Sequence, residues 1–346
     1  TGPRTYEGTR LTGAGRVRHE YDALGRVVLR QKPRLSRKPD TWRYTWDAED
    51  RITAVTTPDG TRWRYTYDPL GRRTAKERMT PDGLTVAERT VFTWDGSVLC
   101  EQTSTSAQVP GGIALTWDHR GLQPIAQTER MLDARQEVVD ERFYAIVTDL
   151  VGAPTELVDE RGELAWRSRS TLWGSTAWNR DATAYTPLRF PGQYFDAESG
   201  LHHNYFRTYD PETARYLSPD PLGLAAAPNP VTYVADPHRW CDPFGLAPYS
   251  DSTRAAQGVD HQLNEAESGK DNHYLKGING DEVKLEKYLR GHLQSPANYV
   301  DDATGARIII DRSLDPSRPV AIIRQDNMIH AYHIEPEDLS NYITPR

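Results

Sequence analysis

The sequence predicts an all-β sheet built from repeats over the first two thirds of the chain, followed by a small α+β domain at the C-terminal end. Three observations predict this: a recurring aromatic–Asp pair, a supply of 18 Tyr and 9 Trp against 6 Phe, and a change of composition after Leu246. Tyr and Trp suit half-buried strands because they combine an apolar ring with a polar tip. No run of about 18 apolar residues occurs, so we expect no membrane span.

The aromatic–Asp pair recurs every 21 to 27 residues along the first third of the chain. It stands in YDALGRVV from Tyr21, in YTWDAEDRITAV at 44–55 and in YTYDPLGRRTAK at 65–76, with weaker copies at 92–99 and 115–125. Each copy reads as a strand, a tight turn and a second strand, with Asp and Gly supplying the turn chemistry. Because one hairpin cannot bury its own face, we expect successive copies to stack edge to edge into an extended sheet.

The phrase Asp-Pro-x-Gly-Leu occurs twice, as DPLGL from Asp220 and as DPFGL from Asp242. Pro fixes φ, Asp accepts hydrogen bonds from the following amides and Gly permits a positive φ, so each phrase is typical of a turn. The spacing also lets the chain fold back and pair the two carboxylates. Two carboxylates in contact can share a proton, so that one acts as general base on a water and the other as general acid. The two phrases are therefore either two ordinary turns or one hydrolytic site.

These segments resemble the Rhs/YD-repeat family, which includes the bacterial Rhs toxins, the C subunits of Tc toxins and the teneurins. The resemblance covers residues 16–246 and is clearest at YAIVTDLVGAPTELVDERGELAWRSRSTLWGS (144–175) and at LRFPGQYFDAESGLHHNYFRTYDPETARYLSPDPLGL (188–224). It implies a β-strip that forms the end of a hollow shell around a toxic C-terminal domain. The implied domains are a YD-repeat sheet at 1–143, a core-associated domain with an autoproteolysis motif at 144–246 and a toxin domain at 247–346.

The resemblance also implies a role for the doubled phrase. In this family the chain cuts itself after the Leu of the second copy, which implies Asp220 and Asp242 as the catalytic pair and Leu246–Ala247 as the cut bond. An upstream arginine takes part, which implies Arg207, with Arg215 as the alternative. The implied partners are the remainder of the shell and a cognate immunity protein. We expect a fragment of a secreted effector that acts in the cytoplasm of a target cell, with the export signal outside this sequence.

The tail, residues 247–346, contains no copy of the repeat and holds five of the ten histidines. Helical spacing at 281–293 precedes three strand candidates at 306–313, 319–325 and 328–335. The pair Asp326-Asn327 is a two-residue hairpin turn that would place Gln325 opposite Met328. The tail is therefore expected to be a helical half followed by a short antiparallel sheet.

The chemistry of the tail is predicted from the residue types it contains. It lacks the H-x-E and P-C-x-x-C pattern of zinc deaminases and any H-E-x-x-H, and E-x-K at 282–284 lies in a helical stretch, so we expect no cofactor and no metal. Histidines and arginines without a metal cage suit metal-independent RNA cleavage, in which one group takes the 2′-hydroxyl proton and another protonates the leaving oxygen. The candidates are His273, His292, Arg324 and His330.

Two alternatives to a ribonuclease remain open for the tail. An NAD-using toxin, either an ADP-ribosyltransferase or an NAD glycohydrolase, would use Glu335 as its late acidic residue and His273 near its start. The tail could also be an interaction module without enzymatic activity. The net charge of the chain, −7, disfavours an RNA-binding surface unless basic residues gather locally.

Overall fold

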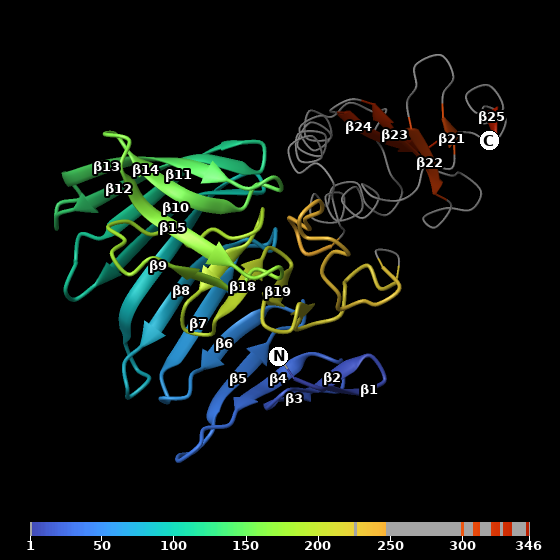
Figure 1. The fold of residues 1–346 in the computed structure, drawn as a ribbon, viewed down its shortest axis with the longest axis horizontal. Coiled ribbons are helices and arrows are strands. Elements are labelled where there is room, and N and C mark those ends of the chain that lie inside the picture. The colour runs from blue at the N-terminus through green and yellow to red at the C-terminus, as the bar shows by residue number, and fades with distance from the viewer. Residues whose placement is uncertain are drawn as a thin grey trace.

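The computed structural model describes residues 2–224 and 227–246, together with five strands of the tail at 299–300, 307–311, 320–325, 328–333 and 344–345. Strands form three sheets of sixteen, four and five members, and the described residues contain no helix (Figure 1). The predicted all-β repeat region is thereby confirmed. The helices predicted for the tail fall outside the described residues.

The large sheet is a meander in which every strand pairs antiparallel with its neighbours in the sequence, from β1 to β16. Its strands are β1 (Arg4–Glu7), β2 (Arg10–Ala14), β3 (Val17–Tyr21), β4 (Val27–Lys32), β5 (Asp40–Trp46), β6 (Ile52–Thr56), β7 (Arg62–Tyr67), β8 (Arg73–Met79), β9 (Val86–Asp95), β10 (Val98–Ser106), β11 (Ile113–Arg120), β12 (Gln123–Leu132), β13 (Val138–Thr148), β14 (Pro154–Asp159), β15 (Leu164–Ser170) and β16 (Thr176–Trp178). The edge-to-edge stacking predicted from the repeats is confirmed. The domain limit proposed after residue 143 falls inside β13.

The repeated Asp fixes each turn through its side chain. At Asp22 the carboxylate Oδ1 accepts hydrogen bonds from the amides of Leu24 and Arg26, both at 3.0 Å, which satisfies backbone donors that the turn leaves unpaired. The Oδ2 atom binds the Nε of the arginine four residues on. This ion pair recurs in three copies: Asp22–Arg26 at 2.7 Å, Asp47–Arg51 at 2.8 Å and Asp68–Arg72 at 2.7 Å.

The small sheet lies against one face of the large one (Figure 1). Its strands are β17 (Tyr194–Asp196), β18 (Leu201–Asn204), β19 (Arg207–Asp210) and β20 (Arg215–Tyr216), and nearly every residue in them is buried. Leu201 and Leu217 pack with Tyr44, Val55 and Tyr65 of the large sheet. The burial of apolar side chains from both sheets forms the core.

The two sheets are also joined by buried charges. Asp196 of β17 accepts hydrogen bonds from Arg73 of β8 at 2.7 and 3.0 Å and from Lys76 at 3.2 Å, and Lys76 contacts Glu198 at 3.2 Å. Tyr65 donates to Glu198 at 2.7 Å. This cluster fixes the position of β17 and so of the strands that follow it.

The tail strands are β21 (Tyr299–Val300), β22 (Arg307–Asp311), β23 (Val320–Gln325), β24 (Met328–His333) and β25 (Thr344–Pro345), in the sheet order β24-β23-β22-β21-β25. The three predicted strands are confirmed. Gln325 pairs with Met328, as the predicted hairpin requires, while the two turn residues themselves lie outside the described residues.

Candidate functional site

The two copies of Asp-Pro-x-Gly-Leu meet at a single arginine. Arg207 opens β19, and its Nη2 lies 2.8 Å from Asp220 Oδ2 and 3.2 Å from Asp242 Oδ2. The three side chains are only 2 to 4% exposed. A buried charge is costly unless it is paired, so one cation and two anions in contact stabilise one another here. The chain thus folds back to bring Asp220 and Asp242 into one site.

Asp242 is held by neighbours on both of its carboxylate oxygens. Its Oδ1 accepts a hydrogen bond from the amide of Leu246 at 2.8 Å, and its Oδ2 accepts one from the hydroxyl of Tyr216 at 2.7 Å. Its backbone carbonyl accepts from the side-chain amide of Asn204 at 2.9 Å. Leu246 itself is buried, with 1% of its surface exposed. The carboxylate therefore fixes the residue that precedes the predicted cut bond.

Arg207 is held equally firmly. Its Nε donates to the carbonyl of Gly245, its Nη1 donates to the carbonyl of Pro230 at 3.0 Å, and its guanidinium carbon lies 3.6 Å from the centre of the Tyr216 ring. The planar guanidinium supplies several donors in a fixed arrangement, which a lysine could not reproduce. Arg207 consequently ties together β19, the Pro230 loop and the turn of the second phrase.

The two phrases form similar turns in different surroundings. Gly223 and Gly245 both adopt a positive φ, of 63° and 66°. A Cβ placed on Gly245 would lie 2.8 Å from the carbonyl oxygen of Asn204, whereas one placed on Gly223 would meet no described atom within 4 Å. Only the second phrase is packed tightly against the small sheet, and it is the phrase that ends at Leu246.

Electrostatics keep Tyr216 a hydrogen-bond donor. Burial, followed by the negative charge of Asp242, raises the pKa of Tyr216 well above 10.0 despite the opposing effect of Arg207. The sequence-based hypothesis has the two carboxylates share a proton. The structure places the guanidinium of Arg207 in contact with both carboxylates.

The structure distinguishes between the two candidate arginines. Arg207 contacts both carboxylates, whereas Arg215 donates to the carbonyl of Thr9 at 2.5 Å. Asn204 and Tyr216 are additions that sequence reasoning missed. Both lie in the family-like stretch 188–224, but no spacing or motif distinguishes them from other buried polar residues there.

The other predicted residues are not assembled into a site by the described structure. Ala247, His273, His292 and Glu335 lie outside the described residues. Arg324 lies on β23 and His330 on β24, where the register places Arg324 opposite Ile329 and His330 opposite Ile323. The catalytic roles proposed for the tail thus stay predictions.

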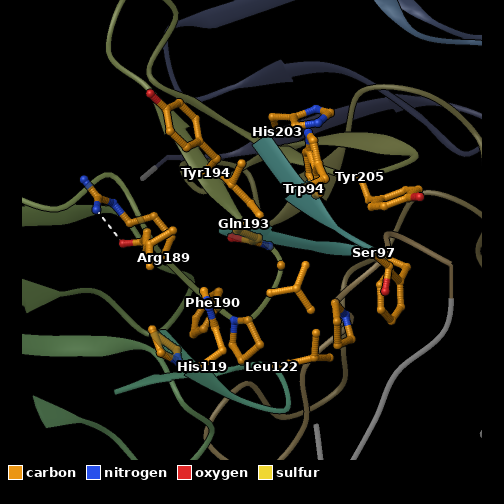
Figure 2. A pocket seen from close by; sticks show the side chains of 18 residues that line it. Trp94, Ser97, His119, Leu122, Arg189, Phe190, Gln193, Tyr194, His203 and Tyr205 are labelled. Atoms are coloured by element: carbon orange, nitrogen blue, oxygen red, sulfur yellow. Dashed lines mark hydrogen bonds between the residues drawn. The ribbon is translucent and has the colours of Figure 1, made fainter. Parts of the chain in front are cut away.

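A small cavity adjoins the second phrase (Figure 2). It has a volume of about 40 Å³ and is lined by Pro243 and Phe244 together with Trp94, Gln193 and His203. Burial, followed by the positive charge of Arg73, lowers the pKa of His203 well below 6.5. The cavity is far smaller than the roughly 300–1,000 Å³ of typical ligand sites, so it is not a pocket for a small-molecule substrate.

No group of three or more His, Cys, Asp or Glu among the described residues is arranged to hold a metal ion. Within the same residues, no helix is long and apolar enough to cross a membrane.

The chain matches two protein-family models and is similar to several bacterial toxin proteins. The family model described as RHS Repeat matches residues 40–62 and 46–85, and the one described as RHS protein matches residues 143–180. The chain is 37% identical over 261 residues to double-stranded DNA deaminase toxin A of Burkholderia cenocepacia (strain H111), a match that covers 70% of this chain and 18% of that protein. It is 31% identical over 307 residues to probable deoxyribonuclease RhsA of Dickeya dadantii (strain 3937), covering 86% of this chain and 20% of that protein.

Among solved structures, the crystal structure of TcdB2-TccC3 matches 66% of this chain and 14% of its own chain, at 18% identity and a TM-score of 0.49. The chain spans about a fifth of the length of the two curated relatives. Both family models fall on segments that the structure shows as strands and Asp turns of one continuous sheet. The chain belongs to the RHS-repeat (YD-repeat) family.

Proposed function

We propose that this chain is part of an RHS-type toxin and that it cuts its own backbone between Leu246 and Ala247. The observation that carries the proposal is the convergence of Arg207, Asp220 and Asp242 in a buried site that binds the amide of Leu246 at 2.8 Å. Hydrolysis by a pair of carboxylates needs the peptide bond to be held in place beside them. Here Asp242 holds the amide of Leu246, the residue that precedes the bond.

The proposed reaction is hydrolysis of one peptide bond. A water adds to the Leu246 carbonyl, the bond to the Ala247 nitrogen breaks, and the products are a Leu246 carboxylate and an Ala247 amine. Both carboxylates are engaged on both oxygens: Asp242 by Leu246, Tyr216 and Arg207, and Asp220 by the amide of Leu222 at 2.8 Å and by Arg207 at 2.8 Å. Asp242 binds the amide of Leu246, so we assign to it the positioning of that residue. We assign to Asp220 the role of the general base, which takes the water proton and returns it to the leaving nitrogen.

Intact mass measurement of the purified full-length chain tests this reaction. The wild type should give two pieces that separate between Leu246 and Ala247, and Asp220→Asn and Asp242→Asn should each give one uncut chain. Asp210→Asn is the matched control, because Asp210 is equally buried on β19 but does not contact Arg207 in any described interaction, and it should still be cut. An uncut wild type, or normal cutting of both variants, would contradict the proposal.

A second proposal concerns the tail, which we infer acts on nucleic acid. Residues 1–246 make up about 71% of the 346 residues. The match to the probable deoxyribonuclease RhsA covers 86% of the chain, so it includes residues after Leu246. That match is to a protein named a probable deoxyribonuclease. It favours DNA as the substrate over the RNA that the histidines and arginines of the tail suggest. The same proposal includes two partners, the remainder of the shell and a cognate immunity protein. It also includes delivery of the tail into a target cell.

Incubation of the purified chain with DNA, RNA and NAD separates these alternatives. Loss of DNA, with RNA and NAD unchanged, is the expected result. Cleavage of RNA that persists in the presence of a chelator and is lost in His330→Ala would instead indicate a metal-independent ribonuclease. Release of nicotinamide that is lost in Glu335→Gln would indicate an NAD-using toxin, and inertness toward all three would leave an interaction module.

A further inference from the structure

The Asp turns at one edge of the large sheet share a second feature, in which an arginine reaches across to the following turn. In a meander every second turn lies at the same edge, so the turns after β3, β5, β7, β9, β11, β13 and β15 follow one another along one edge of the sheet. Arg26 Nη1 donates to the carbonyl of Asp47 at 2.8 Å, and Arg72 Nη1 donates to the carbonyl of Gly96 at 2.9 Å. The arginine of one turn thus occupies the space between that turn and the next.

The turn between β13 and β14 keeps the backbone of this motif but lacks the arginine. The Asp149 amide donates to the Ala153 carbonyl at 2.9 Å, and Asp149 Oδ1 accepts from the amides of Val151 and Ala153 at 3.2 and 2.9 Å. The residue four positions after the Asp is alanine here. Among the described residues, none forms an ion pair with Asp149, so its second carboxylate oxygen does not hold the guanidinium that it holds at Asp22, Asp47 and Asp68.

A cavity of about 430 Å³ lies where that arginine side chain would run. Asp149 and Ala153 line one side, and Thr171 and Gly174 of the next turn at the same edge line another. The lining is rich in hydroxyl groups, from Thr155, Ser168, Ser170, Thr171 and Thr176. A carboxylate and several hydroxyl oxygens are acceptors, and they match a group that carries many donors.

We propose that this cavity binds a guanidinium group, presented by an arginine side chain of a polypeptide. The carboxylate of Asp149 accepts its Nε and Nη donors in the geometry seen at the three arginine-bearing turns, and the hydroxyl oxygens accept the remaining donors. The volume lies within the roughly 300–1,000 Å³ of ligand sites and exceeds that of one side chain, so flanking residues of the polypeptide enter as well.

Two other basic groups line the cavity. His238 lies in the cavity wall together with Asp149. The Nη1 atom of Arg189 donates to the carbonyls of Thr186 and Leu188 at 2.9 and 2.7 Å, its guanidinium carbon lies 4.6 Å from the centre of the Phe195 ring, and its Nε and Nη2 atoms are buried. Partial desolvation raises the pKa of Asp149, so binding of a cation by its ionised carboxylate is favoured at neutral over acid pH.

Calorimetric titration of the full chain with N-acetyl-arginine amide tests the proposal, with N-acetyl-citrulline amide as the uncharged ligand of the same shape. We expect the arginine compound to bind and the citrulline compound to bind at least about tenfold more weakly, since a charged hydrogen bond is lost. Free L-arginine, whose α-amino and carboxylate charges a polypeptide lacks, separates a free amino acid from an arginine within a chain. Tighter binding of free arginine would overturn the polypeptide source.

Ala153→Arg supplies the missing guanidinium from the chain itself and should abolish binding, and Asp149→Asn should weaken it at least about tenfold. The matched control is Glu163→Arg, which places an arginine four residues after Asp159 in a turn with the same amide hydrogen bonds but outside this cavity. It should leave binding unchanged. Equal binding of the arginine and citrulline compounds, no binding of either, or undiminished binding by Ala153→Arg would each overturn the proposal.

Discussion

Replacing Asp196 by Asn removes one charge from the cluster that joins the two sheets. Asp196 accepts two hydrogen bonds from Arg73 and one from Lys76, and the three side chains are 2 to 9% exposed. The amide keeps the size of the carboxylate but leaves two buried cations against Glu198 alone. Breaking a buried pair from one side costs about 3–5 kcal/mol, a large part of the roughly 5–15 kcal/mol that stabilises a typical domain.

Urea unfolding followed by tryptophan fluorescence measures this loss. The matched control is Asp140→Asn, which breaks a pair with Arg142 of 3.0 Å whose side chains are 53% and 47% exposed. Water and salt screen that pair, so its loss should cost less than about 1 kcal/mol. Because the cluster positions β17 and the strands after it, Asp196→Asn should also slow self-cutting. A shift in the unfolding midpoint no larger than that of the control would refute this reasoning.

The pH dependence of stability and one glycine substitution give two further tests. Burial lowers the pKa of His202 and His203 well below 6.5. Below pH 6.5 both histidines therefore bind protons in the unfolded chain but stay neutral in the folded chain. The free energy of unfolding should therefore fall by up to about 1.4 kcal/mol per pH unit for each histidine, measured by urea unfolding between about pH 7.5 and 5.5, and a flat profile would contradict this. Gly245→Ala should abolish self-cutting because its Cβ would lie 2.8 Å from the Asn204 carbonyl oxygen, whereas Gly223→Ala, with the same positive φ and open surroundings, should still be cut in the mass measurement. Equal cutting of both glycine variants would argue against the tight packing of the second phrase.

The repeat could be predicted from sequence because its determinants are local. An aromatic residue, an Asp and an Arg within a few positions define a turn whose hydrogen bonds close inside that turn, as at Asp22 and Arg26. The doubled Asp-Pro phrase is equally local, and it identified Asp220 and Asp242. The partners of those carboxylates could not be predicted in this way, because Asn204 and Tyr216 reach them only through the pairing of β18, β19 and β20.

The sequence by itself determined the antiparallel strip, the chemistry of its turns, the strands of the tail and the two aspartates of the candidate site, since each depends on neighbours within one hairpin or one motif. Only the tertiary structure decided that Arg207 rather than Arg215 lies between those aspartates, and that Asp149 faces a cavity in place of an arginine. Both outcomes depend on how the small sheet and its loops pack on the large one. Contacts between segments far apart in the chain are set by burial and by the pairing of buried charges, which no short pattern encodes.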